Sequence, residues 1–563
     1  MTLDVVISAN SIQSGEKDII SNYESGGVGI SLKSGVPTFT IYIAGTGYVS
    51  VSAKKALTVG EKTRITATYD GSMMKIYINN VLDEQKSQSG IIKAPESNTV
   101  MMIGANPSGS NAVEMFANID VYSVKVHNVA LAIREIWNSA TVVTSWDVSA
   151  QADGSIKAWI VNQNQPYTVY IGSTGTIYAN SDSTDLFAHI GYSSICTATT
   201  VIENLNLLNT SNVTNMDHVF YYFGYNAMTS LDLGNYFNTG NVTSMMEMFV
   251  DCGHNSMTSL NLGSLFNTTS VTNMNWMFAR CGYEKMTSLS LGSNFYTYSV
   301  QTMKGMFQSC GYSSMTRLDL GAYFNTGNVT DMYAMFHSCG YKAMTSLDLG
   351  TLFNTANVTN MNAMFISCGH DSMTSLNLGG NFYTHSATNM DSMFNDCGYE
   401  KMTSLSLEGN FNTSKVTTMR QMFTNCGYKS MTTLNLGSQF NTSSVESMYR
   451  MFDNCGYNAM TSLDLGQLFD TSNVTNMQRM FTDCGHNSMV TLNLGNKFNT
   501  SNVTNMLNIF NKCGYESMTS LNLGDLFDTS KITEMQNMFT YCGYTSMTSL
   551  NLGSKFNTSN VTN

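Results

Sequence analysis

Eleven cysteines spaced 29 residues apart are the most regular set of reactive side chains in the sequence. The set is Cys252, Cys281, Cys310, Cys339, Cys368, Cys397, Cys426, Cys455, Cys484, Cys513 and Cys542. Zinc sites require cysteines or histidines paired within about two to four residues, whereas each copy here supplies one thiol. Such a column offers no thiol a preferred disulfide partner, although neighbouring copies fall within bonding range. We therefore expect a structural core column of buried free thiols, with sporadic disulfides as the alternative.

The sequence contains no other arrangement typical of a catalytic site. Three of the eight histidines, His254, His370 and His486, occupy a position that is otherwise mostly tyrosine. No serine-hydrolase, phosphate-loop, zinc-protease or dinucleotide motif occurs in its required context. We predict that these residues form no enzyme, and we leave open a catalytic domain outside the given chain.

The composition excludes two classes of partner. Lys and Arg number 27 against 39 Asp and Glu, so the chain carries a net charge of −12 and lacks the cationic surface that nucleic acids require. No apolar run reaches the roughly 18 residues of a membrane span. The first residues have no basic or apolar stretch of a secretion signal, and the last copy of the repeat stops partway. We therefore expect a piece of a longer protein.

A 29-residue repeat extends over residues 209–563. Its twelve copies, from Phe220 to Phe539, follow M-F-x-x-C-G-Y-x-x-M-T-S-L-D/N-L-G-x-x-F-N-T-S-N-V-T-N-M without insertion. A fixed period of this length predicts a solenoid. M-x-x-L-x-L predicts a short strand, and V-T-N-M predicts a second extended segment. M-F-x-x-C-G predicts one short helix or 3₁₀ turn that ends at glycine. The fold prediction is mainly β: twelve coils with a parallel β-sheet and short helical turns, preceded by a degenerate cap coil around Phe187.

The residue between the two leucines of L-x-L points outward in this prediction. It is Asp, Asn or Ser in every copy, and asparagine side chains can hydrogen-bond along such a stack. Only Asp319 and Asp348 place two aspartates in adjacent copies. The candidate ligand-binding residues of this surface ladder are Asp232, Asn261, Asp319, Asp348 and Asp464.

The repeat resembles a family of bacterial surface proteins. V-T-N-M-x-x-M-F-x-x-C followed by M-T-S-L-D-L-G is similar to the BspA-type leucine-rich repeats, over roughly residues 145–563. Residues 140–208, with Trp146-Asp147 and Ile156–Ile160, resemble the segment and N-terminal cap coil that lead into such arrays. The resemblance implies a leucine-rich-repeat solenoid over 209–563.

Residues 1–139 form a different domain. They alternate apolar and polar residues between turn signals, and residues 65–79 predict a hairpin around Asp70-Gly71. This pattern predicts an antiparallel β-sandwich, or jelly roll, and it resembles laminin-G/concanavalin-A-like lectin modules. That resemblance implies calcium as the one candidate cofactor, with Asp70 and Asp120 as candidate ligands.

The expected function is non-catalytic binding at the cell surface or outside the cell. A lectin-like module on a rigid repeat stalk would recognise a glycan or a host or cell-surface protein. Two alternatives stay open: a phage or virion fibre, and a filament or sheath subunit that self-associates through the solenoid ends, where an unpaired sheet edge lies. No contact with nucleic acid and no membrane insertion is expected.

Overall fold

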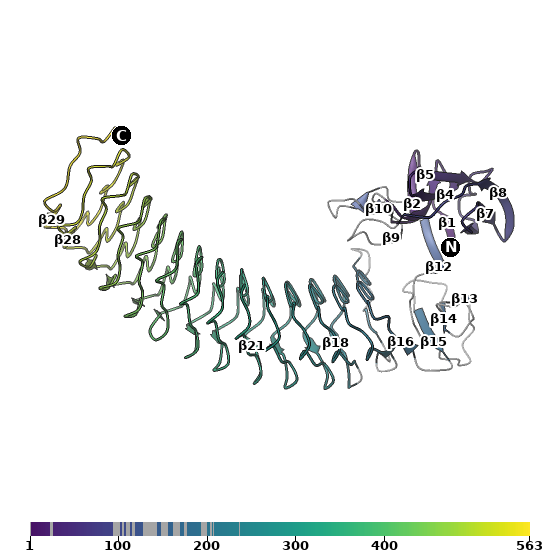
Figure 1. Ribbon diagram of the computed structural model, residues 1–563, viewed down its shortest axis with the longest axis horizontal. Coiled ribbons are helices and arrows are strands. Elements are labelled where there is room, and N and C mark those ends of the chain that lie inside the picture. Colours follow the sequence, from purple (N-terminus) through teal and green to yellow (C-terminus); the bar gives the residue numbers. More distant parts are fainter. Residues whose placement is uncertain are drawn as a thin grey trace. The chain divides into compact units, whose positions relative to one another are not determined.

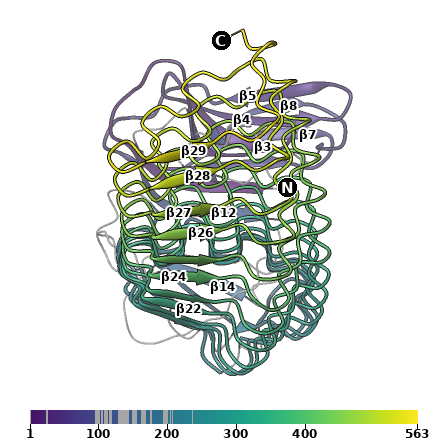
Figure 2. The ribbon, with the colours of Figure 1, turned by 90° about the vertical axis from the view of Figure 1, so that its left-hand side faces the viewer.

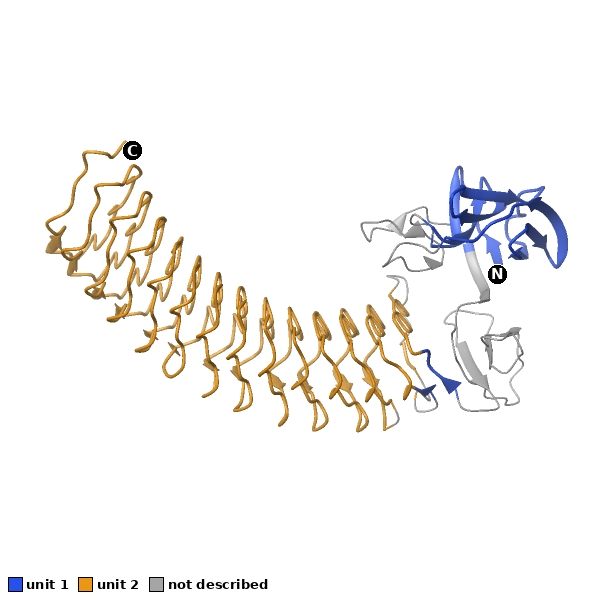
Figure 3. Cartoon of the chain, in the orientation of Figure 1, with its two compact units in different colours: residues 1–180, 207–209 blue, residues 181–206, 210–563 orange. Residues whose placement is uncertain are grey.

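The computed structural model describes most of the chain in two compact units (Figure 3). Unit 1 comprises residues 1–180 with 207–209, and unit 2 comprises residues 181–206 with 210–563. The described residues are 2–22, 26–93, 102–103, 106–107, 113–114, 119–127, 144–147, 156–160, 169–173, 177–192, 200–202, 205, 208–235 and 237–562.

Unit 1 begins with two five-stranded antiparallel sheets, as predicted for residues 1–139 (Figure 1). One has the order β12-β1-β6-β7-β8, and the other β5-β4-β3-β2-β9. Alternate residues point into a shared core, where Leu3, Phe39 and Ile65 are fully buried. The strands are β1 (Thr2–Ala9), β2 (Glu16–Ser21), β3 (Val28–Lys33), β4 (Val36–Ile43), β5 (Gly47–Ser52), β6 (Lys62–Tyr69), β7 (Met73–Ile78), β8 (Val81–Ser87), β9 (Met102–Ile103) and β12 (Ile119–His127).

Shorter strands complete unit 1. The pair β10–β11 and the three-stranded sheet β13-β14-β15 are antiparallel, whereas β16 and β17 pair in parallel. Their bounds are β10 (Asn106–Pro107), β11 (Val113–Glu114), β13 (Thr144–Asp147), β14 (Ile156–Ile160), β15 (Val169–Ser173), β16 (Ile177–Tyr178) and β17 (Leu208–Asn209).

Unit 2 is a β-solenoid of about 13 coils. Parallel bridges link each coil to the next at intervals of about 29 residues, from Asp182–Asn215 to Asn505–Glu534. Each full coil also supplies one three-residue strand, and Figure 2 shows these strands stacked on one side. They are β18 (Ser230–Asp232), β19 (Ser259–Asn261), β20 (Ser288–Ser290), β21 (Arg317–Asp319), β22 (Ser346–Asp348), β23 (Ser375–Asn377), β24 (Ser404–Ser406), β25 (Thr433–Asn435), β26 (Ser462–Asp464), β27 (Thr491–Asn493), β28 (Ser520–Asn522) and β29 (Ser549–Asn551).

Columns of identical side chains fill the inside of the solenoid. The ring of Phe336 is fully buried between those of Phe307 and Phe365, with centroids 5.6 and 5.5 Å away. Phe187 of the cap coil stacks on Phe220 in the same way, at 5.5 Å. Methionine, leucine, valine and cysteine columns surround this stack. The apolar side chains of each coil are covered by the coils before and after it. Each coil is therefore stabilised by its contacts with its two neighbours.

The prediction of short helical turns is wrong: the described residues contain no α-helix. The segment around M-F-x-x-C-G instead has left-handed residues, such as Ala363, Ser367 and Gly369 with φ of 61°, 51° and 54°. Within it, the Cys368 N–H donates to Phe365 in its own coil, but the Ser367 N–H donates to Asn395 of the next. This alternation links coils, whereas a helix would keep every bond inside one segment.

Gly369 shows why the sequence spacing resembled a helix end. Its φ of +54° is favourable for glycine, and a Cβ there would lie 2.5 Å from Cβ of Met373. Glycine is therefore required in this slot, as at a helix C-cap, although no helix precedes it. No described segment forms a helix long and apolar enough to cross a membrane.

Candidate functional site

The outward side of β18–β29, which we call the strand face, carries the candidate ladder predicted from the sequence. Its central leucines point inward, while the flanking residues point to solvent. Asp232, Asn261, Asp348 and Asp464 are exposed, and Asp319 is half-buried. The structure therefore places all five predicted residues on one face.

The strands of this face pair in twos. β18 pairs with β19, β20 with β21, and so on to β28 with β29. Within the pair β22–β23, the Leu349 N–H donates to Asn377 at 3.1 Å, and the Thr374 N–H donates to Thr345 at 2.9 Å. Equivalent bonds between β23 and β24 are missing among the described residues. We call such positions open interfaces; they are β19/β20, β21/β22, β23/β24, β25/β26 and β27/β28.

Side-chain hydrogen bonds along the outward ladder reinforce four of the six bonded pairs. In β22–β23, the amide of Asn377 donates to Asp348 at 3.1 Å, and its oxygen accepts from the Gly379 N–H at 3.1 Å. The second strand of a pair carries asparagine in five of six cases, namely Asn261, Asn377, Asn435, Asn493 and Asn551. The first strand carries Asp232, Ser290, Asp348, Ser406, Asp464 or Asn522. Sequence reasoning missed this two-coil alternation. The ladder residues follow it only in part, because Asp319 lies in the second strand of its pair and Asn522 in the first strand of another.

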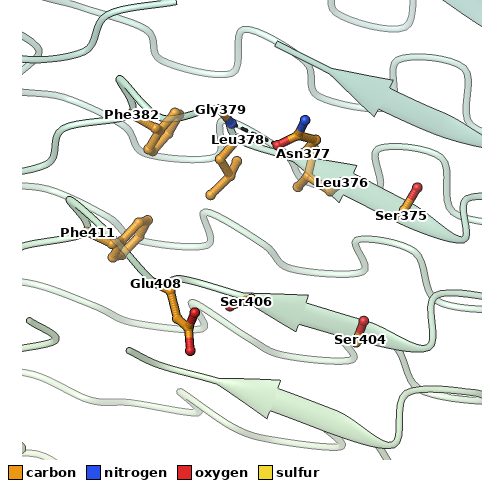
Figure 4. Close-up of a pocket in the computed structure, with 10 residues that line it drawn as sticks. All are labelled: Ser375, Leu376, Asn377, Leu378, Gly379, Phe382, Ser404, Ser406, Glu408 and Phe411. Atoms are coloured by element: carbon orange, nitrogen blue, oxygen red, sulfur yellow. Dashed lines mark hydrogen bonds between the residues drawn. The ribbon is translucent and has the colours of Figure 1, made fainter. Parts of the chain in front are cut away.

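The open interface β23/β24 contains a cleft of about 320 Å³ (Figure 4). Phe382 and Phe411 are the buried aromatic residues that line it, and exposed Ser375, Ser404 and Ser406 also line it. Leu376 is only half-buried, unlike the central leucines of β22 and β24. The cleft thus joins an apolar lining to hydroxyl groups.

The open interface β21/β22 contains a second cleft, of about 510 Å³. It includes Asp319 and Asp348, the adjacent aspartates noted in the sequence, and Arg317, whose guanidinium lies 3.4 Å from Asp319. Like charges directly opposite one another disfavour strand pairing. This repulsion is consistent with the missing pairing at this interface.

The predicted cysteine column lies inside the solenoid. The first ten of its thiols, from Cys252 to Cys513, are fully buried, and none of the eleven forms a disulfide. Burial raises the pKa of Cys368 to about 12, because the thiolate would lose its hydration. Cys542, in the last coil, is only half-buried.

We expect the interior thiols to resist alkylation, because the thiolate is the reactive form. At about pH 8, Cys368 in the folded chain should react on the order of a thousandfold more slowly than after unfolding, and Cys542 should react first. Iodoacetamide labelling and peptide mass spectrometry measure both rates. Cys196, outside the described residues, is replaced by serine for this test. Rapid labelling of Cys368, or a disulfide at it, would contradict the expectation.

Of the two candidate calcium ligands that the resemblance implies, Asp70 has a structural role in a turn. Oδ1 of Asp70 already accepts bonds from Ser72 N–H at 2.9 Å, Ser72 Oγ at 2.8 Å and Met73 N–H at 2.8 Å. These bonds lower the pKa of Asp70 and shape the β6–β7 turn. Asp120 lies in β12, and its side chain is outside the described set. No group of three potential ligands for a metal occurs among the described residues.

The tyrosine position that His254, His370 and His486 share forms a half-buried aromatic column. His370 stacks between Tyr341 and Tyr399, with centroids 4.4 and 4.6 Å away. Because ring faces cover one another, the column presents ring edges to solvent. These histidines therefore extend a structural stack. Nδ1 of His254 and of His370 lie 2.7 and 2.6 Å from the carboxylates of Asp251 and Asp371, which fix the orientation of the two rings.

Comparisons with known proteins match both units. The family described as "Mycoplasma protein of unknown function, DUF285" matches residues 192–314, 283–403, 388–514 and 514–563, together about two thirds of the chain. The concanavalin A-like lectin/glucanases superfamily matches residues 1–137. No curated protein matches.

One solved structure with detectable similarity is the crystal structure of the binding domain of Paraclostridial Mosquitocidal Protein 1. Identity is 16% and the TM-score is 0.18, over 31% of this chain and 61% of that chain. The match thus spans less than two thirds of that domain, and its TM-score supports no structural argument.

Proposed function

The chain belongs to the family described as "Mycoplasma protein of unknown function, DUF285", and from this premise we propose that it is a non-enzymatic adhesion protein of the cell surface. The N-terminal module recognises a glycan or a host cell-surface protein, and the solenoid is the stalk that displays it. The repeat motif resembles BspA-type leucine-rich repeats, which supports the surface location.

The lectin-like module carries this proposal. Residues 1–137 match a superfamily that includes lectins, and they fold into the two antiparallel sheets such modules use. The net charge of −12 opposes binding to anionic polymers and favours neutral ligands. Glucanases also belong to that superfamily, so hydrolysis is tested beside binding.

A glycan array probed with the full chain tests the proposal. We expect binding to neutral glycans that survives about 0.5 M salt, because screening weakens interactions between exposed charges far more than apolar contacts. The same glycans incubated with the chain should release no reducing sugar. Absence of binding to glycans and to host cells would overturn the proposal, and release of sugar would overturn its non-enzymatic part.

Association of the chain with itself is the outcome that would favour the filament alternative. The last strand, β29, has all three of its residues exposed. Light scattering at rising protein concentration measures whether copies add head to tail there. We expect no growth in mass; open-ended growth would replace the adhesion proposal with a filament.

A further inference from the structure

The open interfaces leave backbone groups of the strand face without partners. At β23/β24, the buried Leu378 N–H has no acceptor among the described residues, whereas the equivalent Leu349 N–H is bonded to Asn377. The hydroxyl groups of Ser375 and Ser404 line the same cleft and are exposed. A backbone N–H or C=O group without a partner in the chain can hydrogen-bond to water or to a ligand. The cleft therefore offers neutral donors and acceptors next to an apolar lining.

An added peptide strand does not fit into an open interface. The same two coils remain joined elsewhere, by the bridge between Asn389 and Thr418 and by the Gly427 N–H bond to Cys397 at 3.1 Å. The rings of Phe394 and Phe423 stack with centroids 5.7 Å apart. A β-strand needs about 4.8 Å on each side, so the coils would have to separate. A ligand must lie over the cleft instead.

The lining of the cleft selects the chemistry of that ligand. A sugar ring combines an apolar face with hydroxyl groups that both donate and accept, which matches the half-buried Leu376 beside the exposed serines. The charged groups of the two clefts are Glu408, Asp319, Asp348 and Arg317, so the face is acidic and opposes an anionic sugar.

The repetition of the interfaces points to a polymer. Five open interfaces recur at every second coil between β18 and β29. In a β-linked linear polysaccharide, each sugar ring is flipped relative to the one before it. The groups that the polymer presents to one side therefore also repeat every two sugars. We propose that the strand face binds a neutral, β-linked linear polysaccharide, with one subsite at each open interface. This proposal rests on the glycan-binding function above and places a second glycan site on the solenoid.

A length series of oligosaccharides tests the periodic part of the proposal. Neutral β-1,4-linked glucose and N-acetylglucosamine oligomers of two to eight units are titrated calorimetrically into the full chain. We expect affinity to rise in steps of two units, roughly tenfold or more for each further subsite, because the second contact is intramolecular. A length-independent affinity, or equal binding of an anionic polymer or a lysine-rich peptide, would overturn it.

A cross-linking experiment tests the location. A neutral oligosaccharide carrying a diazirine should label residues 375–379 and 404–408, and also residues 316–321 and 345–350. The double variant Ser375→Val/Ser404→Val removes exposed hydroxyls that line the cleft, and valine suits a strand. We expect it to reduce labelling of the first pair at least tenfold and to leave the second pair, an internal control, unchanged.

A matched variant removes two hydroxyls from the same coils on another face. Thr388→Val/Thr417→Val changes exposed threonines, and we expect labelling to be retained at both clefts. If the array shows binding but neither cleft is labelled, the sandwich alone binds and the solenoid proposal fails. If the array shows no glycan binding, glycan recognition by the N-terminal module and this proposal both fail, and the proposed function is left with a host cell-surface protein as its ligand.

Discussion

Replacing Phe336 with alanine should lower the free energy of unfolding of the solenoid by about 3–5 kcal/mol, as for other large core residues. The ring is fully buried, lies between Phe307 and Phe365, and also contacts Phe353 at a centroid distance of 6.2 Å. Its loss leaves a cavity that neighbouring coils cannot close without shifting their own stacks. Urea unfolding of the full chain measures the effect.

Two variants of the same coil serve as controls for Phe336→Ala. Phe336→Leu keeps an apolar side chain and should cost clearly less. Tyr333→Ala removes a ring that is 39% exposed and should change stability by only about 0.5 kcal/mol. If Phe336→Ala resembled Tyr333→Ala, the stacked rings would not be the main support of the solenoid.

Asp18→Asn should stabilise unit 1 by about 2–3 kcal/mol above about pH 7 and have no effect near pH 3. Asp18 is fully buried in β2, and burial raises its pKa from 3.8 to about 6. Glu16 raises the pKa further, whereas the bond from the Ser21 hydroxyl and the charge of Lys33 lower it. Oδ1 has no hydrogen-bond partner. The folded state therefore favours the protonated acid.

The sign follows from proton linkage. The contribution of protonated Asp18 is fully present below its ordinary pKa of 3.8 and is lost as pH rises through about 6. Asparagine cannot ionise and avoids this loss. Hydrogen exchange of β2 and β3 in the full chain, corrected for intrinsic rates, measures the difference, with Lys17→Gln as the control on the same strand. A gain that did not vary with pH would show that charge is not the cause.

The repeat made most of the solenoid predictable. Once Phe220 to Phe539 recur at one spacing, every coil must place equivalent residues in equivalent positions, so the inward leucines and the outward Asp232 and Asn261 follow directly. The alternation around Asp70-Gly71 predicted the β6–β7 hairpin for the same reason: a strand has only two faces.

The turns with left-handed residues and the open interfaces were not predicted, for two physical reasons. Spacing within M-F-x-x-C-G cannot distinguish a helix from a turn with left-handed residues such as Ser367, because the choice depends on bonds to the next coil. The open interfaces depend on backbone bonds between particular coils, which the ladder residues alone do not determine. Asn493 and Asn522 lie on either side of an open interface, whereas Ser290 and Asp319 belong to a bonded pair.

The alternation of bonded and open interfaces also has a mechanical consequence. A stalk that anchors one body to another is pulled along its length, and tension concentrates where adjacent layers share the fewest bonds. Under load, the solenoid would part first at the open interfaces and release its layers two at a time. Each release would lengthen the tether by a fixed increment and absorb work before the attachment itself breaks.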